Sequence, residues 1–270
     1  MAAQPEKPRH HAVGIDLAWG DRNLTGLAHL VGPGAREGVG FRSGGDGWRL
    51  LESAVVGPLE GIVAWVQSRV PADAPCQIAI DAPLVATNPA GTAREADKAV
   101  AARFRRFKVA CYPADSVNAA RSIALREALE GLGFSFAPPD ETSVWRGVFE
   151  TFPTAAQLGL FDIRRPVRYK HGPIDVKRVR LRELQMKLAR FEDAAVPLEE
   201  TSAFKALLRT DPGTLRGVEL KSLEDRLDAF LCGLVAVLAW SAPERLLTLG
   251  RKEEGAVTVP HPPPEPGLVI

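Results

Sequence analysis

Acidic residues stand beside apolar segments at several separate places in the chain. Asp16, Asp81 and Glu150 each lie inside or at the end of a short apolar run. Asp225 and Asp228, three residues apart, come directly before the most apolar stretch of the sequence. A carboxylate in such a setting is costly unless it is paired or bound to a cation. We therefore expect these side chains to converge at one place.

Converging carboxylates repel one another unless a cation compensates them, and Mg²⁺ and Mn²⁺ prefer oxygen ligands. Two such ions about 4 Å apart can hold the attacking and the leaving oxygen of a phosphodiester. We predict catalytic roles for Asp16, Asp81, Glu150 and Asp228. We predict Mg²⁺ or Mn²⁺ binding by the same four residues together with Asp225.

Simpler roles stay open for most of these acids. Asp16 could cap the turn that follows it, and Asp81 could be a turn residue before Pro83. Glu150 could lie on an exposed edge strand. The pattern Ser222-x-x-Asp225 is typical of a capping box, which would make Asp225 structural. Asp228 has no capping role of this kind.

The elements that must position these residues follow from hydrophobic periodicity and turn residues. The pattern predicts strands over residues 11–18, 24–31, 37–42, 76–80 and 146–152, while residues 245–249 could form an edge strand or no element. It predicts helices over residues 48–70 (broken or kinked at 57–58), 92–108 from a Thr92–Glu95 capping box, 116–130, 176–191 and 222–240. An antiparallel meander followed by crossover units indicates a mixed sheet with helices on its faces.

The same pattern indicates one domain. We predict a disordered tail over residues 1–10, a single domain over 11–259 with a helical insertion at about 84–145, and a proline-rich tail over 260–270.

Composition narrows the class of protein. The 34 basic and 33 acidic residues nearly balance, which argues against an indiscriminate polyanion binder. The three cysteines form no C-x-x-C pair, so a zinc site or disulfide framework is not expected. The N-terminus lacks the apolar segment of a signal peptide, and no apolar run is long enough for a membrane helix. We expect a cytoplasmic protein without membrane contact.

Local basic clusters could still bind nucleic acid, because phosphate contacts dominate such affinity. We predict nucleic-acid contacts, to DNA or RNA, from Arg94, Arg103, Arg105, Arg106, Lys108, Lys170, Lys177 and Arg178. The alternative is that these are ordinary solvated helix faces. Phe104 and Phe107, which interleave one cluster, are expected in the core.

Five short motifs carry a family resemblance. They are Gly14-Ile15-Asp16, Ile80-Asp81-Ala82-Pro83-Leu84, Arg94-Glu95-x-Asp97, Glu150-Thr151-Phe152-Pro153 and Asp225-x-x-Asp228-Ala229. In order and spacing they resemble the DUF429 family of predicted ribonuclease-H-like nucleases. The last motif also resembles the end of RuvC-type resolvases, where two aspartates three apart open the final helix.

That resemblance implies a ribonuclease-H-like α/β fold, with a mixed five-stranded sheet and helices on both faces. It implies that Asp16, Asp81 and Asp228 are core metal ligands and that Glu150 and Asp225 are auxiliary. RuvC-type enzymes act as dimers, so a homodimer is possible.

The first functional hypothesis is therefore a metal-dependent nuclease. The second is an ATP-dependent phosphotransferase of the actin and sugar-kinase type, although no second glycine-rich phosphate loop is found. The third is a non-catalytic scaffold that binds nucleic acid or protein.

Overall fold

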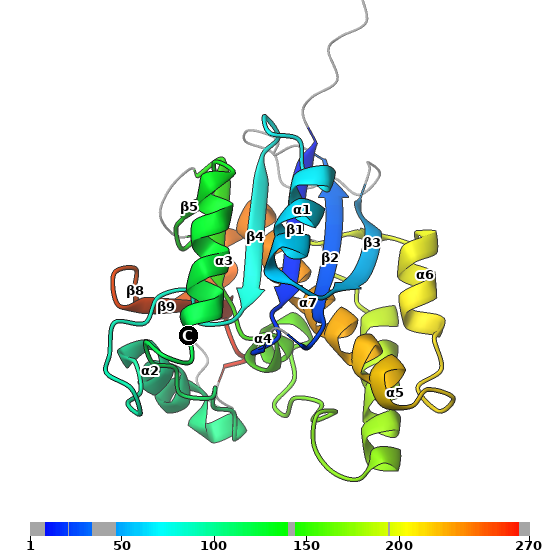
Figure 1. The fold of residues 1–270 in the computed structure, drawn as a ribbon. Helices are drawn as coiled ribbons and strands as arrows, with labels where there is room; N and C mark the ends of the chain where they lie inside the picture. Colours follow the sequence, from blue (N-terminus) through cyan, green and yellow to red (C-terminus); the bar gives the residue numbers. More distant parts are fainter. Residues whose placement is uncertain (1–8, 21, 34–46, 140–143, 194, 265–270) are drawn as a thin grey trace, which may run out of the picture.

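The computed structural model describes residues 9–20, 22–33, 47–139, 144–193 and 195–264 of the 270-residue chain (Figure 1). Its strands are β1 His10–Asp16, β2 Thr25–Gly32, β3 Trp48–Val56, β4 Cys76–Asp81, β5 Ser135–Phe136, β6 Arg146–Glu150, β7 Leu198–Glu199, β8 Leu246–Arg251 and β9 Gly255–Pro260. Its helices are α1 Leu59–Arg69, α2 Glu95–Phe104, α3 Ala120–Gly131, α4 Pro153–Leu160, α5 Ile174–Ala189, α6 Ser202–Arg209 and α7 Gly217–Ser241, with 3₁₀ turns η1 Arg105–Phe107 and η2 Pro243–Arg245.

All nine strands belong to one mixed sheet, in the order β7-β3-β2-β1-β4-β6-β9-β8, with β5 paired to β6. Strands β1 to β3 form an antiparallel meander, and β4 and β6 then run parallel to β1. The mixed α/β class is confirmed, but the predicted count of five strands is wrong. Strands β5 and β7 are only two residues long, too short for alternation to reveal them. The predicted strand over residues 37–42 lies outside the described residues.

Helices cover both faces of the sheet, as expected. Alternate side chains of β1 and β4 point to opposite faces: Val13, Ile15, Ile78 and Ile80 belong to the cluster beneath α1 and α3. The other face lies against α7, whose apolar segment is almost wholly buried. Figure 1 shows α1 and α3 in front of the sheet and α7 behind it. No helix among these residues is long and apolar enough to cross a membrane.

The predicted helix over residues 48–70 is wrong in its first half. Residues 48–56 form β3, which pairs with β2, and only 59–69 form a helix. Trp48 and Leu50 are both buried, whereas Leu51 is exposed, which is the two-residue period of a strand. Leu51 and Val55 also match helical spacing, so the sequence pattern was ambiguous there. Pro58 is the residue directly before α1, where its fixed φ is compatible with helix initiation.

Helix α7 packs on the sheet through glycines. A Cβ added to Gly14 of β1 would lie 1.8 Å from the Ala229 carbonyl oxygen, and one added to Gly26 of β2 would lie 2.0 Å from that of Asp225. Both distances are far shorter than any non-bonded contact. The helix backbone therefore rests directly on two strands, which brings its acidic first half to the carboxyl end of β1.

Histidines gather at the opposite end of β1. The ring of His10 stacks on Trp240, and His11 Nδ1 lies 2.9 Å from His29 Nε2. Burial, and then the charge of His11, lower the pKa of both His10 and His29 to about 4. These rings are therefore neutral at neutral pH in the folded protein.

This cluster predicts loss of stability in acid. The unfolded chain takes up protons near pH 6.5, whereas folded His10 stays neutral until about pH 4, so stability falls as pH drops between these values. We expect His10→Phe, which keeps a ring against Trp240, to remove about 2 kcal/mol of the acid loss. Urea unfolding of both proteins at about pH 7 and about pH 4.5 measures the difference. Parallel pH dependences would rule out a contribution from His10.

Candidate active site

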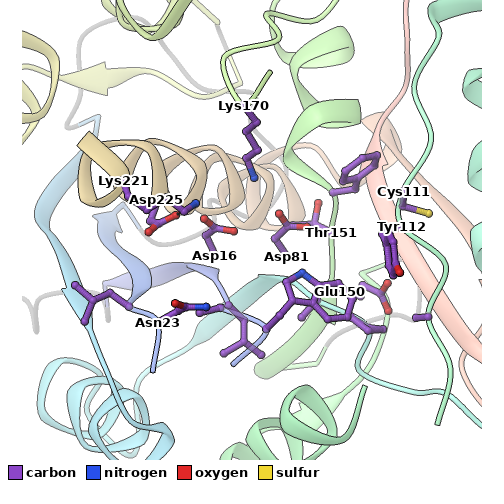
Figure 2. Close-up of a pocket in the computed structure, with 18 of the residues that line it drawn as sticks. Asp16, Asn23, Asp81, Cys111, Tyr112, Glu150, Thr151, Lys170, Lys221 and Asp225 are labelled. Carbon is purple, nitrogen blue, oxygen red and sulfur yellow. The ribbon is translucent and has the colours of Figure 1, made fainter. Parts of the chain in front are cut away.

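Two aspartates lie side by side at the carboxyl edge of the sheet. Asp16 ends β1 and Asp81 ends β4, and the two are direct partners in the parallel register. Asp16 lies two residues after Gly14, which faces α7, so the Asp16 side chain projects from the same face of the sheet. The Asp81 side chain projects from that face too, because Asp81 is paired with Asp16. Figure 2 shows the two carboxylates pointing toward the same space. Parallel pairing and pleat thus bring together two acids that are 65 positions apart.

Helix α7 adds two more acids to this space. Asp225 and Asp228 are buried and share one face of the helix through their three-residue spacing. The helix begins at Gly217, so Ser222 lies inside it and the capping-box interpretation of Asp225 is wrong. Instead, Asp225 accepts a hydrogen bond from the ammonium group of Lys221 at 2.5 Å.

Asp228 is held by two neighbouring residues of the loop before α5. The Tyr169 hydroxyl donates to Asp228 Oδ1, and the Lys170 ammonium lies 2.7 Å from Asp228 Oδ2. Oδ2 has no partner with hydrogen-bond geometry among the described residues, although the ion pair is close. Lys170 was predicted to contact nucleic acid, and in the structure its side chain points into the acidic cluster (Figure 2).

The electrostatics of the cluster agree with this crowding of like charges. Burial raises the pKa of Asp16 well above its usual range; Lys170 opposes the shift, and Asp228 and Asp81 add to it. Burial likewise raises the pKa of Asp81 to about 6, again against the attraction of Lys170. Burial opposes the charge on Lys170, but Asp228 and Asp16 outweigh it and raise its pKa well above normal. Lys170 is therefore the cation that the cluster shares.

Glu150 lines the same cavity as Asp16 and Asp81 but points away from their cluster. It is the partner of Ile80 in the β4–β6 register, so its side chain leaves the opposite face from Asp81. Arg94 binds both of its oxygens, at 2.6 and 2.8 Å, and the Leu84 backbone N–H donates to one of them at 3.2 Å. Burial raises the pKa of Glu150 in spite of Arg94. Both Glu150 oxygens are thus occupied by the protein itself.

Arg94 is the centre of this buried network. Its side chain also bonds Asp97, at 2.7 Å, and only 3% of Arg94 is exposed. Asp97 accepts the Arg94 backbone N–H at 3.1 Å, so the cap of α2 is formed by this pair and not by Thr92 and Glu95. The Arg94 side chain is therefore too buried to make the predicted contact with nucleic acid.

The other predicted nucleic-acid residues divide into two groups. Arg106 and Lys108 are exposed and line a cavity of about 430 Å³ that also includes arginines of the loop before α5. Arg103, Arg105, Lys177 and Arg178 line none of the principal cavities among the described residues. Arg178 donates to the Leu215 carbonyl at 2.8 Å, which is a structural role. Phe104 and Phe107 are buried, as expected.

A cavity of about 680 Å³ opens over the aspartates. Six of the predicted site residues line it, namely Asp16, Asp81, Arg94, Glu150, Lys170 and Asp225. So do residues that the sequence analysis did not assign to a site, among them Trp19, Tyr112, Thr151 and Lys221. Thr151 lies beside Asp81 (Figure 2), and its buried hydroxyl has no hydrogen-bond partner among the described residues. Two of these had a signal in the sequence: Lys221 through its four-residue spacing from Asp225, and Thr151 through its place in the motif that begins at Glu150.

Comparison with protein families gives one match. A family model described as "Protein of unknown function (DUF429)" matches residues 34–254. The chain belongs to the DUF429 family. The region that matches DUF429 contains Asp81, Glu150, Asp225 and Asp228, and it begins after Asp16. No curated protein and no solved structure matches the chain significantly.

In the described part of this DUF429 chain, no three His, Cys, Asp or Glu side chains are arranged to hold a metal ion. The cation that the structure places among the acids is the ammonium of Lys170, which contacts Asp228.

Proposed function

We propose that this DUF429 chain is a Mg²⁺- or Mn²⁺-dependent nuclease with a ribonuclease-H-like core. The fold proposal is supported by the antiparallel meander β1–β3, the parallel strands β4 and β6 beside it, and a final long helix that carries aspartates. On this view the β8–β9 hairpin and the two-residue strands are additions to a common core. That core would place a first-strand acid, a central-strand acid and a last-helix acid together.

The observation that carries the functional proposal is the Asp16–Asp81 pair facing α7. Asp16 and Asp81 lie on paired strand ends, and Asp225 and Asp228 lie opposite them on α7. The four carboxyl groups outnumber the two ammonium groups that contact them, those of Lys170 and Lys221. Buried like charges of this kind are maintained at functional sites because a ligand compensates them. A cationic ligand would relieve this repulsion without protonation of Asp16 and Asp81, whose pKa values are raised, and the open cavity above the pair gives it access.

The chemistry of the donor atoms suits a hard divalent ion, but with Lys170 in place the described acids are not arranged to hold one. All candidate ligand atoms are oxygens, and Asp228 Oδ2 and Thr151 Oγ1 both lack hydrogen-bond partners among the described residues. Asp16, Asp81 and Asp228 would hold the ion, with Asp225 in support and Lys170 moved aside. Such ions supply activation of water and charge neutralisation in phosphodiester hydrolysis. Glu150 and Arg94 would hold the strand ends in place and not bind the ion.

Calorimetric titration of Mn²⁺ into the purified protein tests this proposal. We expect binding in the wild type and its loss in an Asp16→Asn, Asp228→Asn double variant. The matched control is Asp73→Asn, Asp175→Asn, which neutralises two exposed aspartates away from the cavity and should bind as the wild type does. Absence of binding in the wild type, or equal binding in all three proteins, rejects the metal site.

Hydrolysis is then measured with single-stranded and duplex DNA and RNA in Mn²⁺. Cleavage by the wild type that the double variant lacks supports the nuclease. Metal binding without cleavage of any of these substrates rejects it.

A further inference from the structure

Two aromatic side chains stand exposed at the mouth of the acidic cavity. Trp19 follows β1 and is 55% exposed, and Tyr112 follows η1 and is 74% exposed. Their rings pack edge to face with centroids 5.8 Å apart, and both line the cavity over Asp16 and Asp81. Large aromatic surfaces are normally buried, so an exposed pair beside a polar site offers contact area to a ligand.

Two smaller cavities continue from the acidic cavity. Tyr112 and Lys170 line both the acidic cavity and a neighbouring one of about 270 Å³. Lys108 and Arg168 line that second cavity and also a third, of about 430 Å³. Because neighbouring cavities share lining residues, the three cavities follow one another in space, starting at the aspartates. We call the second and third cavities together the basic cleft.

The walls of the basic cleft are strongly cationic. The third cavity is lined by Arg106, Lys108, Arg164, Arg165, Arg168 and Arg180, with Glu183 as its one acidic lining residue. Its two sides come from η1 and from the loop before α5, which are joined by a hydrogen bond from Arg168 to the Lys108 carbonyl at 2.6 Å. Guanidinium groups carry five N–H donors each, so those that bond a carbonyl still have donors left.

A row of arginines favours a chain of phosphates, and exposed rings favour flat groups that can stack. A polynucleotide whose bases are unpaired presents both at once, whereas a duplex keeps its bases stacked inside. We propose that Trp19 and Tyr112 stack an unpaired base at the mouth of the acidic cavity while the basic cleft holds the adjoining phosphate backbone. Single-stranded nucleic acid is thus the substrate class of the proposed nuclease.

Binding is tested without metal, so that it does not depend on the proposed chemistry. Fluorescence anisotropy of a labelled single strand of about 12 nucleotides is measured in EDTA at several salt concentrations. We expect Tyr112→Leu to weaken binding about tenfold with an unchanged salt slope, because stacking releases no counterions. Tyr112→Phe, which keeps the ring, should restore binding.

The cleft is tested by Arg164→Gln, Arg165→Gln. We expect about tenfold weaker binding and a shallower salt dependence, by about 0.7 for each phosphate that the variant no longer neutralises. The control is Arg209→Gln, an exposed arginine on α6 outside these cavities, which should bind as the wild type does. The Asp16→Asn, Asp228→Asn protein should still bind the strand, which separates this inference from the metal site.

Three results would overturn the inference. They are no binding of single strands, tighter binding of a duplex of the same length, and loss of affinity in the Arg209 control equal to that in the cleft variant. Binding that is insensitive to Tyr112→Leu would remove the stacking role and leave only a general polyanion site.

Discussion

Replacing Arg94 by Met is expected to lower the free energy of unfolding by about 3–5 kcal/mol, the largest effect of any single substitution proposed for this protein. Arg94 ties Glu150 of β6 to Asp97 of α2, and all three side chains are almost fully buried. Its loss would leave two carboxylates without a counter-ion in a setting of low polarity. Methionine retains much of the side-chain volume, so the effect would come from charge and hydrogen bonding rather than from a cavity.

Urea unfolding followed by circular dichroism gives the size of this effect. Arg69→Met is the matched control, because Arg69 also binds a glutamate in two places but is partly exposed, and its loss should cost less than about 1 kcal/mol. Adding Glu150→Gln to Arg94→Met should recover part of the stability, since one of the uncompensated charges is then removed. An Arg94→Met protein as stable as the Arg69→Met protein would contradict the central role of this network.

Replacing Lys170 by Met should tighten Mn²⁺ binding by about 10- to 100-fold if the metal site is as proposed. In the structure the Lys170 ammonium already compensates Asp228 and opposes the rise in pKa of both Asp16 and Asp81. A divalent ion must break that ion pair or bind beside a positive charge, and either costs affinity. Without the ammonium, the carboxylates would have the metal as their main cation. The apoprotein should lose stability and regain it when Mn²⁺ is added.

Calorimetry and thermal unfolding with and without Mn²⁺ measure both effects. Lys221→Met is the control: Lys221 binds Asp225 and Glu224, but its side chain is 59% exposed, so its removal should change metal affinity much less. If Lys170→Met does not fold without metal, Lys170→Gln supplies the same comparison with a polar side chain. Equal Mn²⁺ affinity in the wild type and both Lys170 variants would show that Lys170 does not compete with the ion.

The parts of the fold that were predictable are those with a local signal. Strands β1, β4 and β6 and helix α7 combine apolar runs with clear turn residues, and each lies within a few residues of its predicted range. The wrong helix over 48–56 shows the limit of the same method, because Leu51 and Val55 satisfied helical spacing while pairing with β2 made the segment a strand.

The site was predictable in part for a related reason. Asp16, Asp81, Asp225 and Asp228 stand next to apolar runs, and the structure brings them to one cavity or its wall. Glu150 had the same local signal and lines the same cavity, but its side chain projects from the other face of the sheet and is bound by Arg94, 56 positions away. Lys170 and Tyr112 lie in irregular segments, where no periodicity indicates which way a side chain points.

The contacts of α7 with Gly14 and Gly26 tolerate substitution differently from the rest of the core around this helix. Over most of its surface, α7 meets a broad apolar cluster, formed by side chains of the sheet and of other helices, in which one aliphatic residue can replace another with modest adjustment. At Gly14 and Gly26, in contrast, no side chain lies between the helix and the strand that could be exchanged for a slightly larger or smaller one. Substitutions in the surrounding core therefore leave these two backbone contacts, which lie beside the strand and helix acids, unchanged. The spacing within the site is set by backbone against backbone, and it can persist while the rest of the interior diverges.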